Sequence, residues 1–142
     1  MGNYTSMVHG QCGLCDGIIK EIDMIGSTNG INIAPTVNTS PSYTAGTGVT
    51  VNAMTVFTVG KLLIVDVNLS VTSAIAHNGE VFTLSGYGTS ITNASPNSLL
   101  GSSSGAIARI RPSISGNNIS FIANGGVIVG TYYIGTALVV LA

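Results

Sequence analysis

Apolar and polar residues alternate most regularly along the segment LLIVDVNLSVT, residues 62–72. Its apolar set consists of Leu63, Val65, Val67, Leu69 and Val71. The set between them consists of Ile64, Asp66, Asn68, Ser70 and Thr72. Because successive side chains of a strand point to opposite faces, this pattern predicts a strand with one buried face. The run 54–59 before it ends at Gly60–Lys61, a Gly-X pair that suits a type II′ hairpin.

The last segment, GGVIVGTYYIGTALVVLA at residues 125–142, is apolar without being a clear helix. Its length is near that of a membrane-spanning helix, and Gly126 and Gly130 make a GxxxG pattern. Glycines cut it into short runs rich in Val, Ile, Thr and Tyr, and no Lys or Arg flanks it. We therefore expect strands and no membrane partner. Both alternating sets of residues 132–141 are mostly apolar, so we expect this strand to be buried on both faces, in a core or between subunits.

The remaining pattern predicts several further short strands separated by turns. Strands are expected at 81–84, 106–111, where Arg109 and Arg111 share one face, and 119–123. Turns are expected at 77–80, 115–118 and 124–126, and a long surface loop at 85–105. Seven or so short strands with turns between them indicate an all-β protein, an antiparallel β-sandwich or jelly-roll-like domain.

The beginning of the chain has a different pattern. In LCDGIIKEIDMI, residues 14–25, an apolar stripe with the spacing 3, 4 and 3 predicts a short helix. The stripe consists of Cys15, Ile18, Ile22 and Ile25. If the stripe is the contact surface, or seam, between associated helices, isoleucine at both of its repeating positions favours three or four helices. A helix packed on its own domain explains the stripe equally well. We therefore divide the chain into an N-terminal attachment or neck segment, 1–30, helical or extended, and a β domain, 31–142.

The composition adds that little of the surface is ionic. Only 6% of the residues are charged, against about 25% in an ordinary soluble domain, and the net charge is −1. A nearly neutral chain has no basic surface for nucleic acid, so we expect no nucleic-acid partner. Apolar faces in such a chain are often covered by contacts between subunits.

Few residues offer catalytic or metal chemistry. Cys12 and Cys15 form CGLC, but no strand precedes them and no α/β alternation follows, as a redox CxxC requires. We recognise no GxSxG nucleophile elbow, because the one match to these letters, GSSSG at 101–105, lies in the expected glycine- and serine-rich surface loop. Asp66 and Glu80 are the only carboxylate side chains beyond residue 23. We expect no enzyme activity, no metal and no cofactor.

A saccharide-binding site is a more plausible use of the polar residues. Neutral saccharides are held by aromatic faces and by side chains that form paired hydrogen bonds. The candidate set of that type is His77, Glu80, Tyr87, Arg109 and Arg111. The alternative is that the arginines pair with Glu80 or Asp66 across strands or subunits. Of the adjacent tyrosines, we expect one of Tyr132 and Tyr133 to face the core and the other a neighbouring sheet or subunit.

The order of these segments resembles the C-terminal head domains of bacteriophage tail-fibre and baseplate receptor-binding proteins. The resemblance covers roughly residues 49–142, through MTVFTVGKLLIVDVNLSVTS, VFTLSGYGTS, IRPSISGNNISFIANGGVIV and GTYYIGTALVVLA. The turn LSGYGTS departs from the family pattern, because it lacks that pattern's Pro and Arg.

The resemblance implies a homotrimeric virion head that binds a host cell-surface saccharide and docks on other virion proteins through residues 1–30. A capsid head-fibre or decoration protein, anchored by the same segment, is the alternative. A secreted lectin-like domain is disfavoured, because we recognise no signal peptide in the N-terminal residues.

Overall fold

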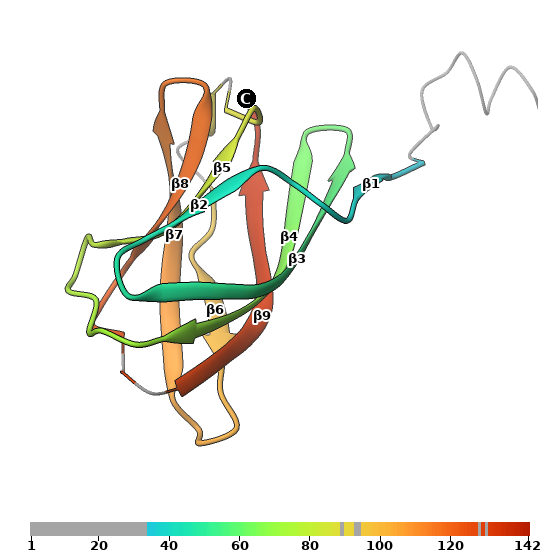
Figure 1. The fold of residues 1–142 in the computed structure, drawn as a ribbon. Coiled ribbons are helices and arrows are strands. Elements are labelled where there is room, and N and C mark those ends of the chain that lie inside the picture. The colour runs from blue at the N-terminus through green and yellow to red at the C-terminus, as the bar shows by residue number, and fades with distance from the viewer. Residues whose placement is uncertain (1–33, 89, 93–94, 128, 130) are drawn as a thin grey trace, which may run out of the picture. The chain divides into compact units, whose positions relative to one another are not determined.

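The computed structural model describes residues 34–142 except 89, 93–94, 128 and 130. Contacts divide the chain after Ala34, and Pro35–Ala142 is one compact unit. Within the described part the structure is all-β and antiparallel, with nine strands and no helix (Figure 1). The fold class expected from the alternation is therefore confirmed. The helix expected at 14–25, with Cys15, Ile18, Ile22 and Ile25, lies outside the described residues.

One hydrogen-bonded sheet contains all nine strands, in the order β1-β3-β4-β9-β6-β7-β8-β5-β2. The strands are β1 (Thr36–Asn38), β2 (Tyr43–Ala45), β3 (Val49–Val59), β4 (Leu62–Val71), β5 (Glu80–Ser85), β6 (Ser98–Gly101), β7 (Ile107–Ser115), β8 (Asn118–Ala123) and β9 (Thr131–Val140). β1 and β2 follow each other in the chain but form the two opposite edges of the sheet. The sheet is curled, and Asn38 of β1 donates a hydrogen bond of 2.8 Å to the hydroxyl of Tyr87, just beyond β5.

The hairpin of β3 and β4 has the geometry that its sequence predicts. Val59 pairs with Leu62, so Gly60 and Lys61 form a two-residue loop. Gly60 has a positive φ of 57° and Lys61 does not, as in a type II′ turn. The five apolar residues of the alternating set in β4 are each at most 2% exposed. The prediction of a half-buried strand is confirmed.

The inner face of the curled sheet forms the hydrophobic core, to which every strand from β3 to β9 contributes. Its largest fully buried side chains include Tyr133, Phe82 and Phe121. Phe82 and Phe121 are cross-strand neighbours, and their rings stack with centroids 4.6 Å apart. Burial of this continuous apolar surface is the main force that closes the sheet on itself.

The prediction of a long surface loop at 85–105 is wrong in one part, because residues 98–101 form β6. β6 pairs with both β7 and β9, and its Leu100 is fully buried opposite Gly135. A Cβ atom at Gly135 would lie 2.8 Å from the carbonyl oxygen of Leu99, so this glycine permits the close approach. Four residues among serines and glycines give no periodic signal of their own, and the pairing partners on both sides define the strand.

The apolar C-terminal segment is a strand, as expected. β9 pairs with β4 along its whole length, from Thr131 opposite Val71 to Val140 opposite Leu62. Among the described residues, no helix has the length and apolar character needed to cross a membrane.

Candidate functional site

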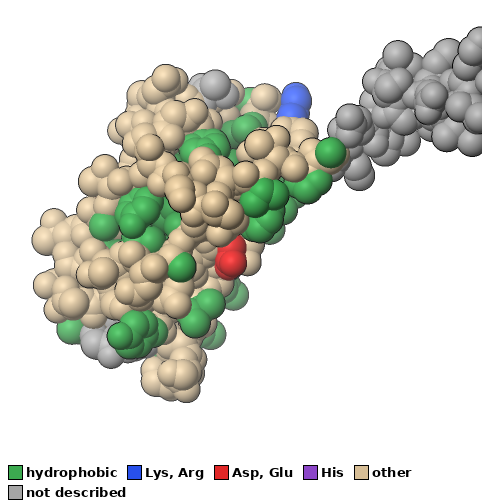
Figure 2. All heavy atoms as spheres, turned by 45° about the vertical axis from the view of Figure 1, so that its right-hand side comes forward, with side chains coloured by type: hydrophobic (Ala, Val, Ile, Leu, Met, Phe, Trp, Pro, Cys, Tyr) green, Lys and Arg blue, Asp and Glu red, His purple; other side chains and the backbone are tan. Residues whose placement is uncertain are grey.

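The outward side of one half of the sheet is unusually apolar. Val37, Phe57, Ile64 and Leu138 are successive cross-strand neighbours on β1, β3, β4 and β9. A second row joins Ile134 of β9 through Gly101 to Ile107 of β7. We call this the apolar outer face, formed by Val37, Phe57, Ile64, Leu99, Ile107, Tyr132, Ile134 and Leu138. Figure 2 shows exposed hydrophobic side chains in several patches, with charged groups sparse among them.

β9 shows the contrast between the two sides of this half. Tyr133, Ala137 and Val139 are fully buried in the core. Tyr132 and Ile134, on the other side, are 62% and 58% exposed. The expectation that one of the two tyrosines faces the core is confirmed for Tyr133. We expected both faces of this strand to be buried. Within the single chain the face with Tyr133 is buried, and the face with Tyr132 and Ile134 is exposed.

The apolar outer face contains a hollow of about 230 Å³, lined by Ala53, Met54, Thr55, Asp66, Val67, Asn68 and Ile134. We call it the Asp66 hollow. The Asn68 side-chain oxygen already accepts a hydrogen bond of 3.0 Å from Asn52. The Asp66 side chain is exposed, and its carboxylate makes no hydrogen bond or ion pair within the described part of the chain. The hollow therefore combines one free carboxylate with an apolar wall.

Arg109 is the second charged residue on this face. It is exposed on β7, directly opposite Leu99 of β6. β9 and β6 lie between β4 and β7, so three strand spacings separate Asp66 from Arg109, or about 14 Å. No ion pair is found among the described residues, so the two opposite charges stand unpaired on one face.

The other half of the sheet has a different outer surface. Cross-strand rows of hydroxyl side chains cover the outer side of β2, β5, β8 and β7. We call this the hydroxyl face, formed by Thr44, Thr83, Ser85, Ser113, Ser115 and Ser120. The Thr83 and Ser120 hydroxyls share a hydrogen bond of 2.7 Å, and both side chains are buried. The buried hydroxyls of this surface thus satisfy each other.

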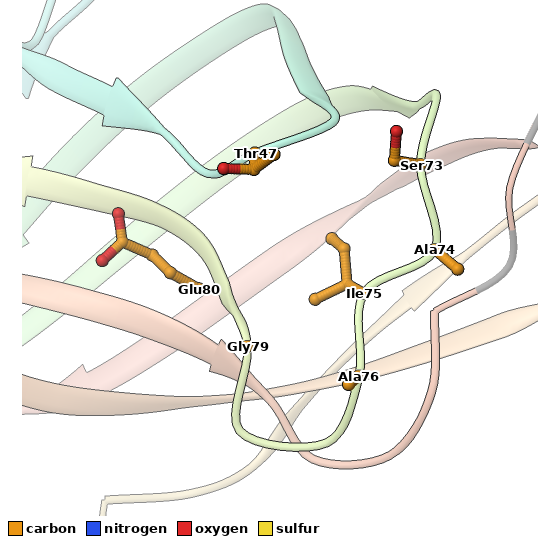
Figure 3. Close-up of a pocket in the computed structure, with 7 residues that line it drawn as sticks. All are labelled: Thr47, Ser73, Ala74, Ile75, Ala76, Gly79 and Glu80. Carbon is orange, nitrogen blue, oxygen red and sulfur yellow. The ribbon is translucent and has the colours of Figure 1, made fainter.

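A second hollow, of about 320 Å³, lies between the turn before β3 and the loop from β4 to β5. We call it the Glu80 pocket, lined by Thr47, Ser73, Ala74, Ile75, Ala76, Gly79 and Glu80 (Figure 3). The Ile75 side chain points into the space between Thr47 and Gly79, whereas the Glu80 carboxylate extends away from Ile75, at the edge of the pocket. The pocket is thus lined by two hydroxyl residues and an apolar side chain, with a carboxylate at its edge.

Backbone hydrogen bonds fix the loop that walls the Glu80 pocket. Asn78 donates to the carbonyl of Ala123 and Val127 donates to that of Ile75, at 2.8 and 3.0 Å. Gly48 has a positive φ of 75°, and a Cβ atom there would lie 2.5 Å from Cβ of Ser73. The turn and the loop therefore pack against each other without room for a larger residue.

The structure separates the five residues predicted to bind a saccharide. Glu80 begins β5 and lines the Glu80 pocket, whereas His77 lies in the loop just before β5 and does not line it. Arg111 donates a hydrogen bond of 3.0 Å to Asn78 of the same loop. Tyr87 lies beyond the other end of β5, which spans about 17 Å. Arg109 is on the apolar outer face. Neither arginine forms an ion pair with Glu80 or Asp66 among the described residues.

Sequence reasoning missed Thr47 and Ser73 as pocket residues. The signal that was available is the turn chemistry around them. Thr47 stands between Gly46 and Gly48, and Asn78, the only described residue other than glycine with a positive φ, precedes Gly79. Such positions mark tight turns whose side chains are presented at one end of a sheet.

The described residues contain no group of three or more His, Cys, Asp or Glu side chains that could hold a metal ion. The two described carboxylates, Asp66 and Glu80, lie on the outer sides of different halves of the sheet. They do not face each other as glycosidase chemistry requires.

Comparison with known proteins finds no significant match, whether to a family model, to a curated protein or to a solved structure.

Proposed function

We propose that this chain is a structural protein of a bacteriophage virion, in which three copies of the β unit form a head that binds a saccharide on the host cell surface. The observation that supports the assembly is the apolar outer face. Side chains such as Tyr132, Ile134 and Ile107 are 58–62% exposed in one chain. Large exposed apolar patches mark interaction surfaces.

Receptor binding is assigned to the Glu80 pocket. Sugar hydroxyls are recognised by carboxylate and hydroxyl groups beside an apolar surface. Glu80 accepts hydrogen bonds there, Thr47 and Ser73 donate or accept them, and Ile75 contacts the sugar ring. The pocket's volume is at the small end of the range for ligand sites, so it suits a single terminal sugar.

The test is binding of fluorescently labelled protein to a panel of bacterial strains. Binding to some strains, with competition by one saccharide from their surface, is the expected result. Glu80→Ala weakens that binding by about tenfold or more, because it removes a charge-assisted hydrogen bond. Ser115→Ala, on the hydroxyl face at the other end of the sheet, is the control and leaves binding unchanged.

Protein that binds no strain while remaining associated with virions contradicts the receptor-binding role. Such a result favours the capsid head-fibre or decoration protein. Binding that Glu80→Ala does not weaken moves the receptor site away from this pocket.

A further inference from the structure

We propose that the apolar outer face is an interface between copies of this chain, in which the guanidinium of Arg109 from one copy enters the Asp66 hollow of the next. This inference rests on the proposed function in that it requires the chain to assemble. It goes further by naming the surface and the pair of residues that fix its register.

The charges of the face carry the argument. Arg111 lies two residues beyond Arg109 on the same outer side of β7, but it already donates a hydrogen bond to Asn78. The charged side chains of the described part that have no such partner here are Asp66 on β4 and Arg109 on β7, and they have opposite signs. Covering the face with a partner removes water from both. An unpaired charge in such a place strongly destabilises the contact, so each one needs a counter-charge from the partner.

The two residues cannot meet that need within one chain. They lie about 14 Å apart, with β9 and β6 between them, and neither has an ion-pair partner among the described residues. A second copy of the chain presents the missing group on the same apolar surface. In such a contact the Arg109 side of the face on one copy meets the Asp66 side on the next, with apolar side chains against apolar side chains and one ion pair at each contact.

The shape of the hollow agrees with an arginine as its occupant. The aliphatic part of an arginine side chain packs well on apolar surface while its charged end binds a carboxylate. Ile134 and Ala53 offer that apolar wall, and Asp66 offers the carboxylate.

The other two described basic residues fit this role less well. Arg111 lies on the same outer side of β7 as Arg109, but it is engaged with Asn78. Lys61 stands at the tip of the hairpin of β3 and β4, outside the apolar outer face. Because Asp66 and Arg109 occupy different places on the face, a closed ring of copies can satisfy both at every contact.

A charge-exchange experiment on the full 142-residue chain tests the inference. The variants are Asp66→Arg, Arg109→Asp and the double exchange, and the readout is native mass by sedimentation over a range of concentrations. We expect each single reversal to weaken association by about tenfold or more, and the double exchange to restore it. Lys61→Asp, at the tip of the hairpin of β3 and β4, and Glu80→Arg, on the other half of the sheet, are matched controls outside the apolar outer face and leave the mass unchanged.

The outcomes separate this inference from the proposed function. An assembled parent whose single reversals assemble equally well overturns the pairing and leaves the proposed head intact. Single reversals that dissociate without rescue by the double exchange also overturn it. A parent that is monomeric at every concentration overturns both proposals.

Discussion

The two halves of the curled sheet share one core but present opposite outer surfaces. On β5, β8 and β7 the outward residues include a cross-strand row of hydroxyl side chains, in which Thr83 and Ser120 hydrogen-bond to each other. On β3, β4 and β9 the corresponding positions include Phe57, Ile64 and Leu138. The first surface is complete in a single chain. The second surface turns apolar side chains outward, where they face solvent in a single chain. The difference teaches that this half of the domain is adapted to a partner that covers it.

The largest difference between the two outer surfaces is expected when a charged residue is placed on each of them in turn. We expect Ile134→Asp to abolish assembly, because an unpaired carboxylate buried at an interface costs several kcal/mol, more than a hundredfold in association. Thr44→Asp, on the hydroxyl face, leaves assembly intact. Native mass by light scattering compares the two. Equal behaviour of the variants would show that the apolar outer face is not the contact surface.

A core truncation separates the inner side of β4 and β9 from their outer side. Leu69→Ala removes a buried side chain and lowers the free energy of unfolding by about 2–5 kcal/mol. Leu138→Ala, on the outer side of β9, lowers it by less than about 1 kcal/mol in the dissociated chain. Urea denaturation at concentrations where both variants are monomeric measures the difference. Equal losses would contradict the assignment of Leu138 to an open surface.

The hydroxyl face is tested through its buried pair. Thr83→Val leaves the Ser120 hydroxyl without its partner, and we expect a loss of about 1–3 kcal/mol in the free energy of unfolding. The double variant Thr83→Val with Ser120→Ala recovers part of that loss, because no buried hydroxyl then lacks a partner. Denaturation of the four members of the cycle gives the coupling energy, and a coupling of zero would argue against the hydrogen bond.

The smallest expected effect is that of salt on assembly. Raising the ionic strength from 0.1 to 1 M shortens the screening length from about 10 to about 3 Å. Because one ion pair per contact is set in a largely apolar interface, we expect association to change by less than about tenfold. Sedimentation at the two salt concentrations measures it. Complete dissociation at high salt would indicate an interface that is mainly ionic, contrary to the apolar outer face.

The sequence predicts the strands with strong alternation well. The segment 62–71 repeats apolar residues at every second position, and its partner 49–59 is fixed by the glycine of a two-residue turn. β6 was not predictable, because its four residues become a strand only through pairing with β7 and β9. Local pattern thus defines the hairpin, whereas tertiary pairing defines the short strand.

The candidate sites were predictable only in part. Residue types pointed to Glu80, which does line the Glu80 pocket, and to His77, which lies in the loop just before β5 and does not line it. Tyr87 was included for its aromatic ring, but the length of β5 carries it away from them. The role of Asp66 beside an apolar wall depends on which side chains face each other across strands, and a single sequence does not reveal that register. The predicted seam at Cys15, Ile18, Ile22 and Ile25 remains a prediction.

The central claim is that another copy of the chain covers the apolar outer face. The native mass of the full chain tests it most directly, measured by light scattering at micromolar concentrations under reducing conditions that keep Cys12 and Cys15 from cross-linking chains. The account predicts the mass of three chains. The mass of one chain at every concentration would contradict it and leave Tyr132 and Ile134 exposed in the working protein.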